Sequence, residues 1–133
     1  MIDVEVPVYA KVTEALLAAF PDIGLSSEHV RAPPSFPHVS IVELDNTVYR
    51  RSQDENTENH ASLLFEWNAY SNLKTGKKAQ CRAIAAVLDS AFAALNFTRT
   101  MQNPIPNAES ATIYRIVGRH SAVVGKDGLI YRK

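Results

Sequence analysis

The chain has 133 residues, a length that predicts one domain built around one hydrophobic core. Apolar residues make up 46% and charged residues 21%, and this near-average balance argues against a disordered chain, a collagen, a coiled coil or a membrane protein. The 14 basic and 14 acidic side chains cancel, so the chain lacks the positive charge typical of nucleic-acid binding, and we expect no sequence-specific nucleic-acid partner.

The first residues, MIDVEVPVYAK, carry acids before the first base and contain no long apolar run. We therefore expect neither a secretory signal nor a transit peptide, and a protein made in the cytoplasm. The longest apolar run, AIAAVLDSAFAAL, is too short to span a membrane, so no membrane partner is expected. The single cysteine, Cys81, excludes an internal disulfide and is expected to be a core thiol.

The first predicted element is a helix over residues 4–20, because its apolar side chains recur on one side of a helix: Tyr9, Val12, Leu16, Ala19 and Phe20. Pro7 suits the first turn of this helix and Pro21 ends it. A short strand follows over residues 23–30, and the prolines of residues 31–37 predict a rigid connection.

Two longer strands are predicted next, over residues 38–51 and 61–72, from their content of β-branched and aromatic residues and their alternation. We expect them to pair antiparallel. The tract between them, residues 52–60, has no apolar side chain and predicts a mobile hairpin tip, because it cannot bury enough surface to offset the entropy of ordering it.

A second helix is predicted over residues 74–96 from the clearest helical stripe in the chain: Cys81, Ile84, Ala85, Leu88, Ala91, Phe92 and Leu95. Thr75 is the expected N-cap and Asn96 the expected C-cap. Three strands complete the chain, in residues 97–107, 110–124 and 128–133, the last two joined by the GKDG turn. These elements predict a single α+β domain over residues 1–133, with a mixed, mostly antiparallel sheet packed by two helices and a long polar-tipped hairpin.

We find no pattern that predicts catalysis, a cofactor or a metal. The five glycines do not form a phosphate-binding loop, and the four histidines are not spaced as metal ligands. We expect these histidines at the surface or at strand ends. Cys81 with His38 or His120 would be the only nucleophilic pair, and the apolar helical stripe around Cys81 argues against it. The sequence therefore predicts a protein that is not an enzyme.

Arg115 and Arg119 lie four residues apart in one predicted strand and so share a face of the sheet. They are either part of a solvated face or an interface that pairs with carboxylates of a partner. Trp67 and Tyr70 are expected in the core or on the sheet face. The candidate interface residues of the whole chain, from the hairpin tip and this strand, are Arg50, Arg51, Asp54, Glu55, Glu58, Arg115 and Arg119.

Charge divides unevenly along the chain. Residues 1–70 hold eleven acids and four bases, whereas residues 71–133 hold ten bases and three acids. If the two halves stay apart in space, the molecule has complementary flanks that suit head-to-tail association in a closed ring. If folding mixes the halves, the division has no consequence for assembly.

Four segments together resemble the small tail terminator, or tail completion, proteins of long-tailed bacteriophages and prophages, especially those of Gram-positive hosts. The segments are IDVEVPVYAKVTEALLAAFP, FPHVSIVELDNTVYRRSQDENTENHASLLFEWNAYSN, GKKAQCRAIAAVLD and FTRTMQNPIPNAESATIYRIVGRHSAVV. The resemblance spans nearly the whole chain and depends on overall pattern, since the family has no catalytic motif.

The resemblance implies an α+β subunit of a hexameric ring in the virion, at the head-proximal end of the tail. Such a ring stops tail-tube polymerisation and joins the tube to the head connector, so the implied partners are other copies of the chain, the tail tube protein and a head-completion protein. It implies no cofactor and no residue-level binding site. Two alternatives stay open: a head-closure or minor capsid protein of the neck, and a small binding module or unrecognised hydrolase.

Overall fold

The computed structural model describes residues 2–28, 33–51, 58–105 and 112–132. Its elements, in chain order, are α1 (Glu5–Ala19), β1 (Gly24–Ser26), β2 (His38–Arg51), β3 (Glu58–Ser71), α2 (Lys77–Ala94), β4 (Thr98–Pro104), β5 (Tyr114–Gly125) and β6 (Ile130–Arg132). This order of helices and strands is the predicted one, and the α+β class is confirmed.

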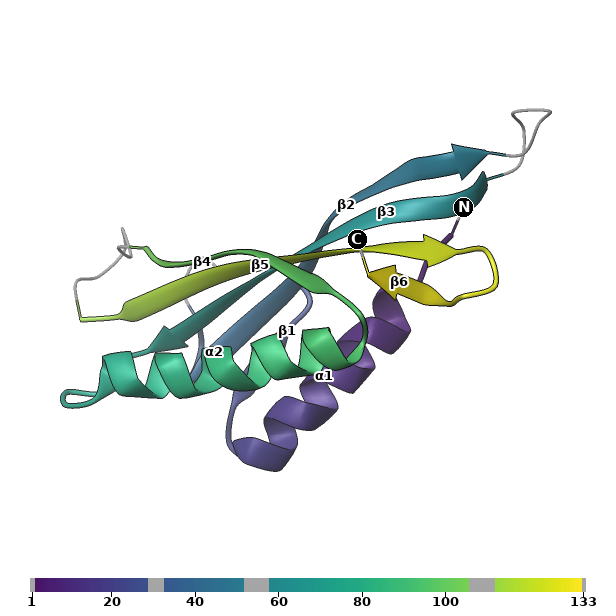
Figure 1. Cartoon of the computed structure of the whole chain (residues 1–133). Helices are drawn as coiled ribbons and strands as arrows, with labels where there is room; N and C mark the ends of the chain where they lie inside the picture. Colours follow the sequence, from purple (N-terminus) through teal and green to yellow (C-terminus); the bar gives the residue numbers. More distant parts are fainter. Residues whose placement is uncertain (1, 29–32, 52–57, 106–111, 133) are drawn as a thin grey trace.

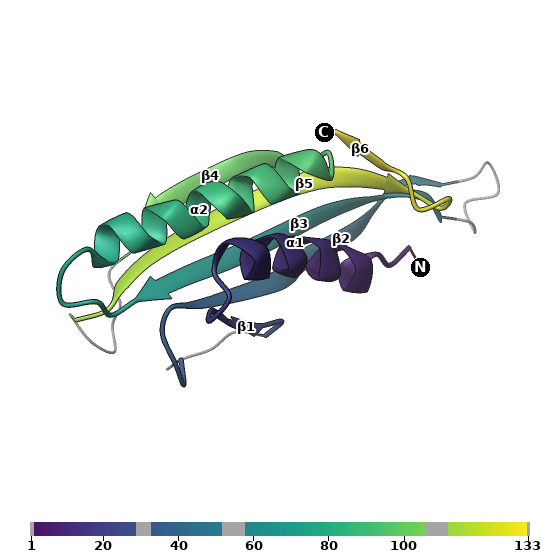
Figure 2. The same cartoon turned by 90° about the horizontal axis from the view of Figure 1, so that it is seen from below.

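The strands form one mixed sheet in the order β1-β2-β3-β5-β4, and β6 pairs with the end of β5. Only the β1–β2 pair is parallel, and every other pair is antiparallel. Both helices lie on the same face of this sheet (Figures 1 and 2). We call the opposite face, which neither helix covers, the open face.

The hydrophobic core lies between the sheet and the helices. Phe65, Phe92 and Phe97 are almost fully buried and pack against one another, with ring centroids 5.3 to 5.9 Å apart. They come from β3, from α2 and from the turn before β4, so this contact fixes α2 against the sheet. The apolar stripe predicted for α2 is the side that faces the core, including the buried Cys81.

Four local predictions need correction. The first strand covers only Gly24–Ser26 of the predicted residues 23–30, since Ser27 and Glu28 form a bend, and residues 29–30 lie outside the described part. The third strand begins at Glu58, so residues 58–60 pair with β2 and are not part of a loop, while residues 52–57 lie outside the described part. The N-cap of α2 is Gly76 in place of Thr75, and its C-cap is Leu95.

Asn96 follows that C-cap with a φ of 67°, the left-handed conformation in which helices commonly end. Its side-chain amide donates a hydrogen bond to the carbonyl of Ile130, 3.1 Å away. The predicted capping residue therefore lies one position beyond the cap and still ends the helix. In the described part of the chain, neither helix combines the length and the apolar character needed to cross a membrane.

Candidate interaction surface

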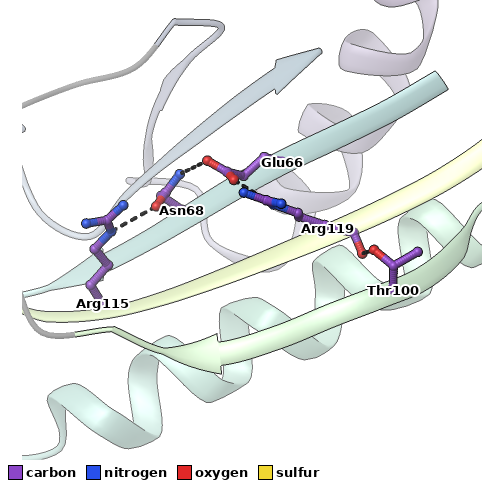
Figure 3. Close-up of polar contacts among 5 residues, drawn as sticks. All are labelled: Glu66, Asn68, Thr100, Arg115 and Arg119. Carbon is purple, nitrogen blue, oxygen red and sulfur yellow. Dashed lines mark hydrogen bonds and ion pairs between the residues drawn. The ribbon is translucent and has the colours of Figure 1, made fainter. Parts of the chain in front are cut away.

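Arg115 and Arg119 lie on the open face, as their spacing in β5 predicts. Arg119 Nε donates to the Glu66 carboxylate at 2.8 Å, and Arg115 Nε donates to the Asn68 side-chain oxygen at 2.8 Å. Asn68 in turn lies 3.5 Å from Glu66, so the four side chains form one line of contacts across β3 and β5 (Figure 3). We call Glu66, Asn68, Arg115 and Arg119 the polar row.

Beyond Arg115, on the side of the polar row nearer β1, lie two aromatic rings. The guanidinium of Arg115 lies 5.8 Å from the ring centre of Tyr70, which is 6.4 Å from the ring of His38. His38 Nδ1 and Ser40 Oγ are both buried without a hydrogen-bond partner, and burial lowers the pKa of His38 below 6.5. This end of the open face is therefore closed off from solvent, although neither helix covers it.

Solvent reaches the polar row at its β5 end. The Arg119 side chain is 41% exposed, whereas its partner Glu66 is only 10% exposed. Arg119 thus neutralises a carboxylate that the sheet has largely removed from water, and it keeps part of its guanidinium at the surface. The arginine pair therefore helps to hold the sheet face, and the exposed part of Arg119 leaves the interface interpretation open.

The other candidate interface residues belong to the segment around the predicted hairpin tip. Arg50, Arg51 and Glu58 have their backbones in β2 and β3 near the hairpin end, and the structure does not describe their side chains. Asp54 and Glu55 lie outside the described residues. Glu58 pairs with Arg51 eight residues before Glu66 along β3, so the described end of this hairpin is a separate region from the polar row.

The sheet order keeps the two halves of the chain apart. β1, β2 and β3 come from the first half and occupy one side of the sheet, whereas β5, β4 and β6 come from the second half and occupy the other. The described side chains of residues 1–70 include eight acids and one base, and those of residues 71–133 include eight bases and two acids. The described part of the molecule therefore has an acidic flank and a basic flank, which meet between β3 and β5 at the Glu66–Arg119 ion pair.

Sequence reasoning missed a carboxylate cluster on the acidic flank. Glu43 of β2 lies beside Asp3 and Glu5 at the start of α1, with the carboxylate oxygens within 4.8 Å of one another. Burial, and then the charges of Glu5 and Asp3, raise the pKa of Glu43 to about 7. It is the one grouping in the described chain that could hold a metal ion, but exposed acidic groups of this kind are common without an ion. A signal was available, because Glu43 follows Val39 and Ile41 in the inward positions of its strand.

His120 was expected at the surface or at a strand end, and this was wrong. It is fully buried in the middle of β5 and stacks on Phe92, with ring centroids 4.7 Å apart. Trp67 Nε1 donates to His120 Nδ1 at 3.3 Å, so Nε2 carries the proton and donates to Asp89 at 3.0 Å. Burial lowers the pKa of His120 below 6.5, and Asp89 partly opposes this. Both ring nitrogens are therefore used: Nδ1 joins β5 to β3, and Nε2 joins the sheet to α2.

Cys81 is a buried thiol in contact with the carbonyls of Ala69 and Tyr114. Burial raises its pKa to about 12, so the reactive thiolate form is suppressed near neutral pH. This surrounding matches the expected core thiol. His38 and His120, the two possible partners considered for it, make their hydrogen bonds elsewhere.

Comparison of the chain with protein-family models and with curated proteins finds no match in either set.

Proposed function

We propose that this chain is a non-enzymatic structural protein that assembles into a ring at the end of a bacteriophage tail tube, as a tail terminator. The observation that carries the proposal is the separation of charge across the sheet. A subunit with one acidic and one basic flank offers each neighbour a complementary surface, and a contact of this head-to-tail kind closes into a ring when the rotation between subunits allows it.

Two further points support the proposal. The resemblance in four segments covers nearly the whole chain, and the fold that it implies, a mixed sheet packed by two helices, agrees with the observed order of elements. The two central groups best suited to chemistry, Cys81 and His120, are buried and engaged in packing. A structural role for the protein agrees with the implied fold and with the use of these two groups in packing.

The test has a biochemical and a genetic part. The purified protein is examined by light scattering and negative-stain microscopy, where we expect closed rings, sixfold if the resemblance holds. The gene is then deleted from the phage or prophage that carries it, where we expect tail tubes of uncontrolled length that do not join heads. A monomer at all concentrations, or normal tails in the deletion, would contradict the proposal. Rings together with unjoined tails of normal length would favour the head-closure alternative.

A further inference from the structure

The sheet has two outer edges along which the described residues place no further strand. On the basic side, β4 pairs only with β5, and no other described strand lies along its outer edge. On the acidic side, β1 covers only three residues of β2, His38 to Ser40. Beyond them, residues 41–51 of β2 have no described strand on their outer edge. Long free edges are unusual in soluble proteins because they accept another strand.

The direction of the backbone groups in β4 follows from one hydrogen bond. The N–H of Ile105, just after β4, donates to the carbonyl of Arg115 in β5 at 3.0 Å. Backbone groups alternate in direction along a strand, so Pro104 and Gln102 direct theirs away from β5. Proline lacks an N–H and is tolerated at such a position only on an edge. Gln102 is then a residue of β4 whose N–H and carbonyl are both offered outward.

The residues around the two edges carry opposite charge. Next to the free part of β2 lie Asp45, which is exposed, and the Glu43 cluster with Asp3 and Glu5. At the other edge, Arg99 of β4 contacts Asp89 of α2 at 3.6 Å. Arg82 lies seven residues before Asp89, which places it on the same side of the helix, and Lys78 lies one turn further along that side.

Strand direction and length also fit. The pairs β2–β3, β3–β5 and β5–β4 are all antiparallel, so β4 runs opposite to β2. When a second copy is placed beside the first in the same orientation, as in a ring, its β2 lies antiparallel to β4 of the first. β4 has seven residues, and residues 42–48 of β2 provide the same length of free edge beyond β1.

We propose that β4 of one copy pairs antiparallel with residues 42–48 of β2 in the next copy, which continues the sheet from subunit to subunit. The proposal rests on the self-association in the proposed function but not on the role in tails. Each edge is interrupted by a bulge, between Glu43 and Asp45 in β2 and between Arg99 and Met101 in β4. Bulged edges resist indiscriminate pairing, so the two edges accept each other only in the register where their bulges are accommodated.

The first test removes the outward N–H of Gln102. Gln102→Pro deletes this donor at a position that makes no hydrogen bond to β5, and Gln102→Ala is the matched control that keeps the donor. We expect the proline variant to remain folded by circular dichroism and to weaken self-association at least tenfold by light scattering. The alanine variant should assemble like the wild type. Equal assembly of a folded proline variant and the wild type would overturn the proposal.

The second test does not depend on the fold tolerating proline. Asp45 in β2 and Asn103 in β4 are exposed, and in the proposed pairing of residues 98–104 with residues 42–48 they are close diagonal neighbours. Each is changed to cysteine, singly and together, while the buried Cys81 stays unreactive. A short bis-maleimide should convert the double variant into a ladder of covalent oligomers and leave each single variant uncrosslinked. Crosslinked dimers of Asn103→Cys alone would show β4 pairing with β4 and overturn the proposal.

The outcomes separate this contact from the proposed function. If rings form but the double variant gives no crosslinked ladder, the proposed edge contact is wrong and the ring proposal is unaffected. A wild-type protein that is monomeric at every concentration overturns both. A ladder in a protein whose deletion leaves tails normal supports the edge contact and overturns the role in tails.

Discussion

At the scale of single residues, Glu43 occupies an inward position of β2 at the cost of a partly buried charge. Its pKa is raised to about 7, so between pH 4.5 and about 7 the unfolded chain releases a proton that the folded chain keeps. The sign follows: folding stability from this group is present at low pH and is lost as the pH rises through that window.

We therefore predict that Glu43→Gln stabilises the protein at pH 8, by about 1 to 2 kcal/mol after allowing for the partial exposure of this side chain. The gain should shrink as the pH falls through 4.5, because below this pH the wild-type carboxyl is protonated in both states. Urea denaturation of both proteins across this range measures the effect. A gain that does not change with pH would contradict the role of the carboxyl charge. Glu14→Gln, on the exposed side of α1, is the control and should change little.

His120 gives the opposite pH dependence. Its pKa in the folded protein is lowered below 6.5 by burial, so at mildly acidic pH the unfolded chain takes up a proton that the folded chain resists. Protonation would also place an N–H at Nδ1, facing the N–H of Trp67. Stability from the neutral imidazole is complete above about pH 6.5 and is lost below it.

We predict that the difference in melting temperature between the wild type and His120→Gln widens as the pH rises from 5 to 7, because only the wild type gains from the neutral ring. If this variant does not fold, NMR titration of the wild-type His120 ring gives the same information. A titration midpoint at or above 6.5 would show that burial does not control this group.

At the scale of the elements, Gly118 of β5 leaves the space that the indole ring of Trp67 in β3 occupies. Gly118 pairs directly with Trp67, and a Cβ added at this glycine would lie only 2.2 Å from an atom of the indole ring. The indole is fully buried, so it cannot move aside without disturbing the core. The glycine is thus required by its neighbour in the adjacent strand and not by a turn.

We predict that Gly118→Ala lowers the free energy of unfolding by about 2 to 3 kcal/mol, the usual cost of overpacking a core. Gly125→Ala is the matched control in the same strand, because its added Cβ would meet mainly the carboxylate of the exposed Asp127, which can swing away. Chemical denaturation of both variants tests the comparison. Equal losses in the two would show that the Trp67 contact is not the cause.

At the scale of the whole molecule, the two charged flanks predict that assembly depends on salt. Exposed ion pairs contribute only about 0.2 to 1 kcal/mol each and are screened beyond about 8 Å at physiological ionic strength, so their effect becomes large only when it is repeated around a ring. Arg119 is a poor choice for testing this by charge reversal, since a glutamate there would face the largely buried Glu66 and destabilise the subunit itself.

Lys78 and Arg82 are better choices, because both are exposed on α2. We predict that the double variant Lys78→Glu, Arg82→Glu stays folded and self-associates more weakly than the wild type at low salt, with the two converging at high salt. Oligomer mass against NaCl concentration, measured by light scattering, tests this. Coincident curves at every salt concentration would indicate that the flanks do not contribute. Lys126→Glu, in the turn after β5, is the control for net charge alone.

Most of the local architecture was predictable because it depends on periodicity, which is a property of neighbouring residues. The stripe of α2, the alternation of β2 and β3 and the turn after Gly125 each placed their elements within a few residues of the observed bounds. Element ends were less predictable. The start of β3 at Glu58 depends on pairing with β2, and no apolar pattern in those residues shows it.

The sequence by itself determined the class of fold, the face shared by Arg115 and Arg119, and the unequal division of charge along the chain. It could not determine whether that division survives folding, because this depends on the order of strands in the sheet. Only the tertiary structure put β3 beside β5 and so kept the halves apart. It also decided the partners of Arg119, Glu43 and His120, because each partner lies more than thirty residues away in the chain and is brought close only by the sheet and the helices packed on it.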